Sequence, residues 1–150
     1  MAHATPRPMN ASQMSDIIEI EQLLAKYAAG MTRDDVESVM EVFTADGWYS
    51  AFGDRYALAD FPRLVAAAPK GLFMTGTPAL ELNGDEGTGI QPMCFVGQSD
   101  HHMRIGYWTD TFRRTDAGWR LATRAVTFLR KSGARDSGRA HDPTRPAPTA

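Results

Sequence analysis

The apolar residues in the first third of the chain repeat with the spacing of an amphipathic helix. They are separated by three and four residues in alternation, which places them along one helix face. Asp16 and Glu19 have the spacing of a capping box and predict the helix start. The stripe that this helix would bury consists of Ile17, Ile20, Leu24, Tyr27 and Met31.

Two shorter helices and a strand are predicted next. The segment "RDDVESVMEVF" suits a second helix that ends at "TADG", and "WYSAFG" suits a short strand. A third helix is predicted with Asp60 as its cap, Pro62 in its first turn and residues 69–71 as its stop. For the second helix we expect Asp34 and Glu37 as caps, with a buried face of Val36, Val39, Met40 and Phe43.

The remaining pattern is that of long strands separated by turn sequences. The strands are predicted at about 72–82, 87–97, 102–114 and 118–129. Their connections, "NGDE", "GQSD" and "TDAG", are typical of hairpins. We therefore expect an α+β fold, with three N-terminal helices in the concave face of a curved mixed or antiparallel sheet. The gap between sheet and helices is a natural pocket.

Length and composition favour one folded unit. The chain has 150 residues, of which 43% are hydrophobic, which suits a single core. Residues 1–14 and 132–150 are rich in Pro, Ala, Ser, Thr and Arg, so we expect disordered tails on either side of a domain over 15–131.

Charge and cysteine content exclude several classes of function. The net charge of −2 gives no basic field for nucleic acid. No segment approaches the ~20 apolar residues of a membrane span, and the N-terminus lacks the apolar core of a secretory signal. With a single cysteine no internal disulfide is possible, so the cytoplasm is the expected location.

His102 and Asp110 lie on one predicted strand and share a face, but they do not form a dyad with each other. They are eight residues apart, which corresponds to roughly 26 Å along a strand. His102 lies near a hairpin tip, where either a solvated turn or a role at the pocket mouth fits. No cluster of His, Cys or acidic residues has ligand spacing, so we expect neither a metal nor any other cofactor.

Asp110 is the main catalytic candidate. It shares a strand face with Trp108 and Phe112, and burial among aromatics would suit a carboxyl group to acid/base work. The alternatives are a structural acid, or a strand turned over so that Asp110 is solvated. Because the opposite face, with Met103 and Ile105, is also apolar, parity alone does not decide which face is inside.

Further candidates are aromatic and polar residues near the expected pocket. Tyr27 either packs in the core or donates a hydrogen bond to a substrate oxyanion. Of the consecutive Trp48 and Tyr49, one should face the pocket. Gln91 and Thr75 could bind a ligand through hydrogen bonds.

Arg124 is expected on the outer face of the sheet. The "TDAG" loop pairs Asp110 with Thr123, so Arg124 would lie on the other face. A register change of one residue would instead join Asp110 and Arg124 in an ion pair.

Two strings resemble a known family. "IIEIEQLLAKYAAGMTRDDVESVMEVFTADGWY" and "GYWTDTFRRTDAGWRLATRAVTF" are similar to the opening and the last hairpin of SnoaL-like proteins, which belong to the nuclear transport factor 2-like superfamily of cone-shaped α+β folds. This resemblance implies a cystatin-like cone and a homodimer or higher homo-oligomer formed through the sheet. It also implies chemistry of the lyase, isomerase or cyclase type.

The residues that carry catalysis in such proteins are mostly replaced here. The resemblance matches the helix-one tyrosine to Tyr27, but the usual aspartate falls on Thr32 and the usual histidine on Phe73. Neither replacement relays a proton.

We therefore expect a cofactor-independent acid/base enzyme acting on a small hydrophobic, carbonyl-bearing molecule of polyketide or terpenoid type. A non-catalytic binding or dimerisation module is the alternative. The candidate catalytic residues are Asp110, Tyr27 and His102, and the candidate substrate-binding residues are Trp48, Tyr49, Phe73, Thr75, Gln91, Trp108 and Thr32.

Overall fold

The computed structural model describes residues 9–129 and 135–136, and in it the first helix begins earlier than predicted. Helix α1 spans Ala11–Arg33. Its N-cap is Asn10, whose side chain and that of Gln13 form a reciprocal capping box. Residues 11–14, predicted as part of a tail, are therefore helical. Asp16 does not cap the helix, because its carboxylate binds Arg114 and the Trp119 indole instead.

The region after α1 holds less helix and more strand than predicted. Helix α2 is confined to Val36–Met40 and is capped by Asp35. Phe43, predicted on that helix, begins strand β1 at Phe43–Ala51, so "TADG" lies within a strand. Strand β2 at Asp54–Ala57 was not predicted. A 3₁₀ turn, η1 at Leu58–Asp60, leads into α3 at Phe61–Ala67, which has the expected proline in its first turn.

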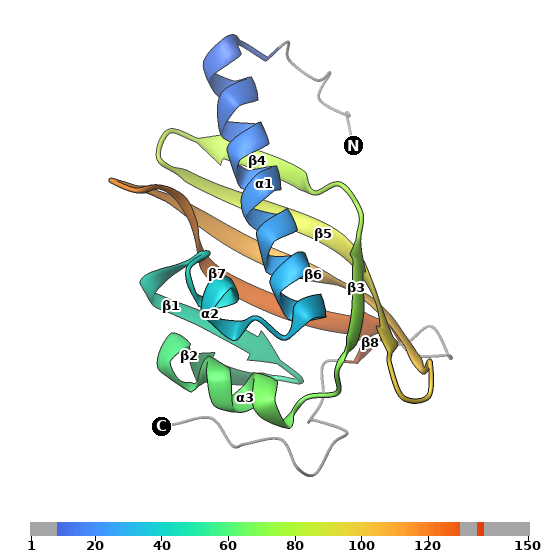
Figure 1. The fold of residues 1–150 in the computed structure, drawn as a ribbon. Coiled ribbons are helices and arrows are strands. Elements are labelled where there is room, and N and C mark those ends of the chain that lie inside the picture. The colour runs from blue at the N-terminus through green and yellow to red at the C-terminus, as the bar shows by residue number, and fades with distance from the viewer. Residues whose placement is uncertain (1–8, 130–134, 137–150) are drawn as a thin grey trace.

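The remaining strands form one curved sheet with β1 and β2 (Figure 1). The predicted strand over 72–82 is two strands, β3 at Gly71–Thr75 and β4 at Ala79–Asn83, and both pair with β5. The strand order is β2-β1-β7-β6-β5-β3, with β1 and β7 parallel. Strands β5, β6, β7 and β8 span Glu86–Gly97, Met103–Thr115, Gly118–Leu129 and Arg135–Asp136.

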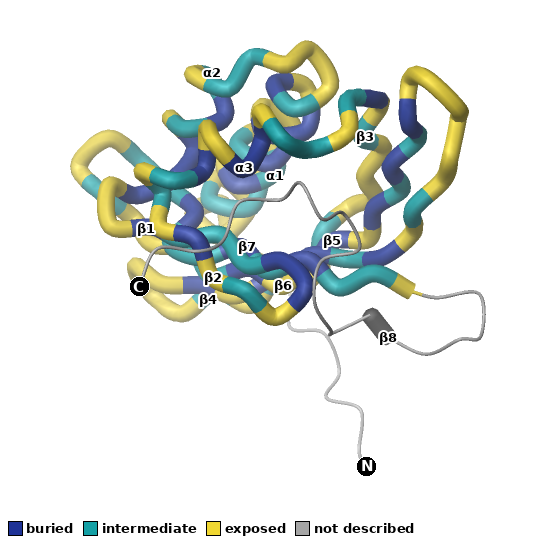
Figure 2. The backbone as a smooth tube through the Cα atoms, turned by 90° about the horizontal axis from the view of Figure 1, so that it is seen from below, coloured by how far each residue is buried: buried dark blue, intermediate teal, exposed yellow. Residues whose placement is uncertain are grey.

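The helices cover one face of the sheet and define its inside (Figure 2). Trp108, Asp110 and Phe112 are buried on this concave face, whereas Met103 and Ile105 are exposed on the other. The α+β cone expected from the sequence is therefore confirmed, with Asp110 inside. No helix within 9–129 is long and apolar enough to cross a membrane.

An irregularity between β6 and β7 changes the predicted register. Arg114 pairs with Trp119 as expected, but the register shifts between Thr111 and Phe112. Asp110 consequently pairs with Arg124 rather than with Thr123. This shift turns the side chain of Arg124 to the concave face, where it is completely buried.

Candidate active site

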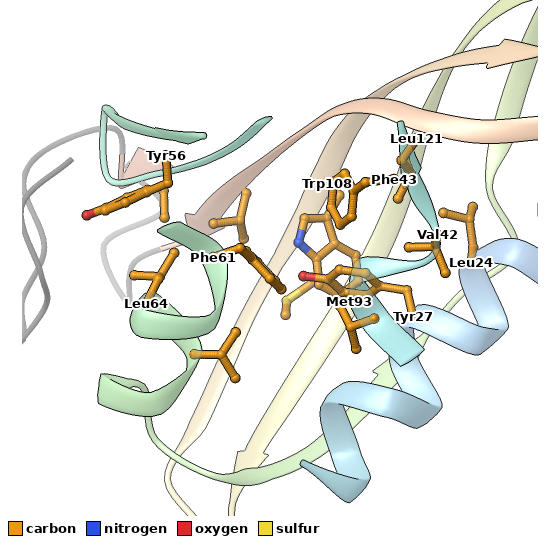
Figure 3. Packing of buried hydrophobic residues seen from close by; sticks show 14 of the residues in the cluster. Leu24, Tyr27, Val42, Phe43, Tyr56, Phe61, Leu64, Met93, Trp108 and Leu121 are labelled. Carbon is orange, nitrogen blue, oxygen red and sulfur yellow. The ribbon is translucent and has the colours of Figure 1, made fainter. Parts of the chain in front are cut away.

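An aromatic pocket lies between α1, α3 and the concave face of the sheet. Its volume is about 50 Å³, compared with roughly 10–15 Å³ for one water molecule. Side chains therefore fill most of the gap between sheet and helices, which we expected to be an open pocket. Figure 3 shows Tyr27, Phe61, Met93 and Trp108 converging from the helices and the sheet. The lining is Tyr27, Met31, Tyr49, Phe61, Leu64, Val65, Ala68, Pro69, Phe73, Met93, Phe95, Arg104, Trp108, Val126 and Phe128.

A buried polar network lies behind the aromatic wall. The Arg124 guanidinium donates from Nε and Nη2 to the two carboxylate oxygens of Asp110, both at 2.9 Å. Nη2 also donates to Gln91 Oε1 at 2.9 Å, and Gln91 Nε2 donates to the Gly76 carbonyl at 3.1 Å. Arg124 is thus fixed by β5 and β6 as well as by its own strand.

The guanidinium also stacks against two rings of the pocket wall. The Cζ atom of Arg124 lies 4.0 Å from the centre of the Trp108 ring and 4.3 Å from that of Tyr27. The two ring centres are 5.5 Å apart in an edge-on arrangement. A desolvated cation against aromatic faces is worth about 2 kcal/mol in favourable cases. Arg124 therefore holds both rings in place from behind.

The prediction that Arg124 lies on the outer face of the sheet is therefore wrong, and Asp110 lies against a buried cation. Burial lowers the pKa of the Arg124 guanidinium, but the charge and hydrogen bonds of Asp110 more than offset this, so the pKa lies above its ordinary value. Both oxygens of Asp110 are occupied by Arg124, and Asp110 is not part of the pocket lining. The geometry therefore favours a positioning role for Asp110.

Three aromatic residues of the pocket lining carry polar groups, namely Tyr27, Tyr49 and Trp108. Burial raises the pKa of the Tyr27 phenol well above its ordinary value, aided by its interaction with Tyr49. The phenol is therefore neutral at physiological pH. Trp108 Nε1 is buried, and none of the described residues offers it an acceptor. A buried unsatisfied donor costs about 1–3 kcal/mol.

Three of the predicted substrate-binding residues line the pocket, namely Tyr49, Phe73 and Trp108. Tyr49 is thus the member of the Trp48–Tyr49 pair that faces inward, while Arg55 stacks on the Trp48 ring outside the pocket. The other predicted site residues, Trp48, Thr75, Gln91, Thr32 and His102, are not part of the lining. His102 is exposed near the β5–β6 hairpin.

Thr32 and Phe73, which the family resemblance matched to an aspartate and a histidine, contact each other. The Thr32 hydroxyl accepts a hydrogen bond from the Phe73 backbone N–H at 3.0 Å. The Phe73 ring stacks at 6.3 Å on Trp108 and borders the pocket. In this chain Thr32 therefore makes a structural contact and Phe73 forms part of an apolar wall.

Several pocket residues were not identified from the sequence. Phe61, Met93 and Phe95 look like ordinary core residues in the sequence, and only the tertiary packing gathers them. Arg104 shares strand parity with Trp108, which was a usable signal. Among the described residues no group of three or more His, Cys, Asp or Glu side chains could hold a metal ion.

Replacing Arg124 by Met should destabilise the fold by about 3–5 kcal/mol, because the Asp110 carboxylate would be left buried without a partner. The double variant Asp110→Leu/Arg124→Met should recover most of that loss. Denaturant unfolding would measure the free energy of unfolding of the single and the double variant. Arg113→Met, which breaks the exposed pair with Asp46, is the control and should leave stability nearly unchanged. A single variant as stable as the control would contradict the role given to the pair.

The chain is similar to known proteins over most of its length. The SnoaL-like domain profile matches residues 12–125. Rv2910c of Mycobacterium tuberculosis is 28% identical over 131 residues, which cover 79% of this chain and 89% of that protein.

Two solved structures illustrate the shared fold. One is a nuclear transport factor 2-like protein with a cystatin-like fold from Novosphingobium aromaticivorans (TM-score 0.65, 24% identity, 80% of this chain and 87% of that chain). The other is a hexachlorocyclohexane dehydrochlorinase, LinA-type3, from Novosphingobium barchaimii (TM-score 0.65, 14% identity, 77% of this chain and 87% of that chain). The chain therefore belongs to the SnoaL-like family and has the cystatin-like cone of the nuclear transport factor 2-like superfamily.

Proposed function

We propose that the aromatic pocket binds a small, largely apolar molecule through one carbonyl oxygen. The observation that carries this proposal is the Trp108 indole N–H, which is buried in the pocket wall without a protein acceptor among the described residues. A ligand carbonyl would satisfy this donor and gain a hydrogen bond in a surrounding of low dielectric. The neutral phenol of Tyr27, which also lines the pocket, favours an oxygen acceptor over an apolar group at the same place.

The pocket volume limits the size of this ligand. A dry protein cavity that binds benzene has a volume of roughly 150 Å³, three times that of this pocket. A monocyclic ligand would therefore enter partly and displace side chains, with the flexible Met31 and Met93 as the adaptable part of the lining. Polycyclic ligands of the polyketide kind need a larger opening than this conformation has.

Cyclopentanone should bind about fivefold to tenfold more tightly than methylenecyclopentane, which has the same shape without the acceptor. Trp108→Phe should abolish that preference, whereas Trp48→Phe, outside the pocket, should retain it. Both affinities would be measured by titrating each compound into the protein and following the indole N–H signals in ¹H–¹⁵N spectra. Equal affinity of the ketone and the hydrocarbon for the wild type would contradict the proposal.

A cofactor-independent reaction of the lyase, isomerase or cyclase type is the second candidate function. It is supported by three polar groups in the pocket lining, the phenols of Tyr27 and Tyr49 and the indole N–H of Trp108. Groups of this kind would stabilise the enolate oxygen formed when a proton leaves the carbon next to a carbonyl. A structural neighbour of this fold is named a dehydrochlorinase. No carboxylate or histidine belongs to the pocket lining, so solvent or the substrate itself would take the proton.

If this second function holds, 3-hydroxycyclopentanone should lose water to give cyclopentenone faster with the protein than in buffer. The increase in enone absorbance would measure the rate. Trp108→Phe should lower this rate by about tenfold or more, as expected when an oxyanion loses one donor. A rate equal to that of buffer would leave ligand binding as the function.

We further propose that two copies of the chain associate through the outer face of the sheet. Large apolar side chains from β3, β5 and β6 lie exposed there, and strand register places Met74 and Ile105 on either side of Cys94. The patch consists of Leu72, Met74, Ile90, Met103 and Ile105, each 46–59% exposed. An exposed patch of this kind marks an interaction surface more often than a solvated one.

The cytoplasmic location stays a prediction.

Ile105→Arg should convert the expected dimer into a monomer, because the charge would be buried in the interface. Ile18→Arg is the matched control, since Ile18 is 59% exposed on α1, away from the sheet face. Light scattering after gel filtration would give both masses. A monomeric wild type would contradict this proposal.

A further inference from the structure

The pocket has one charged lining residue, Arg104, at the end where the wall meets solvent. Arg104 is the second residue of β6 and is half-buried, whereas Trp108 on the same strand face is completely buried. The two Cα atoms are separated by about 13 Å, from a rise of ~3.3 Å per residue. Along β6 the pocket lining therefore changes from a half-exposed cation, Arg104, to the fully buried Trp108.

No side chain lies between these two groups along the strand face. The residue between them with the same parity is Gly106. A Cβ atom at this position would collide with the Thr127 carbonyl oxygen of β7, so the close approach of β7 requires glycine. On the neighbouring strands Phe95 pairs with Arg104 and Phe128 pairs with Gly106, and both belong to the pocket lining.

Arg104 has no carboxylate partner among the side chains that the structure describes. Its recorded contact is with the Phe128 ring, whose centre is 5.9 Å from the guanidinium carbon. Lys70, which follows the lining residue Pro69, is by contrast paired, since it binds Asp34 and the Val65 carbonyl. Among the described side chains Arg104 is thus a half-buried guanidinium without an ion-pair partner, at the more exposed part of an apolar pocket, and it is well placed to bind an anionic group.

We propose that the natural ligand is a small apolar carboxylate, whose charged end binds Arg104 while its apolar body enters the aromatic pocket. This inference rests on the proposed ligand-binding function and specifies the class of ligand. Arg104 supplies charge-assisted hydrogen bonds at the entrance, and the Asp110–Arg124 pair at the bottom is already neutral. Carboxylates are therefore preferred over amines, and the anion binds at the mouth rather than at the bottom.

Three probes of the same shape separate this inference from the proposed function: cyclopentanecarboxylate, cyclopentanecarboxamide and cyclopentylamine. The wild type should bind the carboxylate about tenfold or more tightly than the amide, with the amine weakest. Arg104→Gln should reduce carboxylate affinity to that of the amide and leave amide affinity unchanged. The retained amide affinity shows that the variant is folded.

Arg55→Gln is the matched control, because Arg55 also stacks on an aromatic ring, that of Trp48, but lies outside the pocket. It should bind all three probes like the wild type. Equal binding of carboxylate and amide by the wild type would overturn the Arg104 inference while leaving the pocket function intact. Absence of binding by every probe would overturn both.

Discussion

The ion pair between Asp110 and Arg124 is the interaction on which the pocket depends. Two charges are taken out of water together, and the cost is offset only because both carboxylate oxygens, Gln91 and two aromatic faces surround the guanidinium. The same contacts fix the orientation of Trp108 and Tyr27. A buried polar pair therefore sets the shape and polarity of an otherwise apolar wall.

The fold followed from periodicity, because the features that decide it are local and repeated. The sequence pattern predicted the apolar stripe on α1, the proline of α3 and the turns between β5, β6 and β7. The ends of the helices were predicted less accurately. Asn10 and Gln13 cap α1 from within a polar segment, and Asp16, which has cap-like spacing, is engaged by Arg114 instead.

The site was only partly predictable, because one local irregularity decides it. Without the register shift between Thr111 and Phe112, Arg124 would point outward and Asp110 would lack its partner. Nothing in the residue pattern marks such a shift, since Thr111, Ala122 and Thr123 suit regular strands equally well. Thr32 and Phe73 were singled out by the family resemblance alone, and the structure joins them through one hydrogen bond from the Phe73 backbone to the Thr32 hydroxyl.

We propose the Trp108 N–H, held by Tyr27 and the Asp110–Arg124 pair, as the polar end of a binding pocket. The most direct measurement is a crystal structure of the protein soaked with cyclopentanone. We expect the ketone ring among Phe61, Phe73 and Phe95, with its oxygen within hydrogen-bond distance of Trp108 Nε1. A ketone bound on the outer face of the sheet, or in the pocket with its oxygen turned toward solvent, would contradict the account.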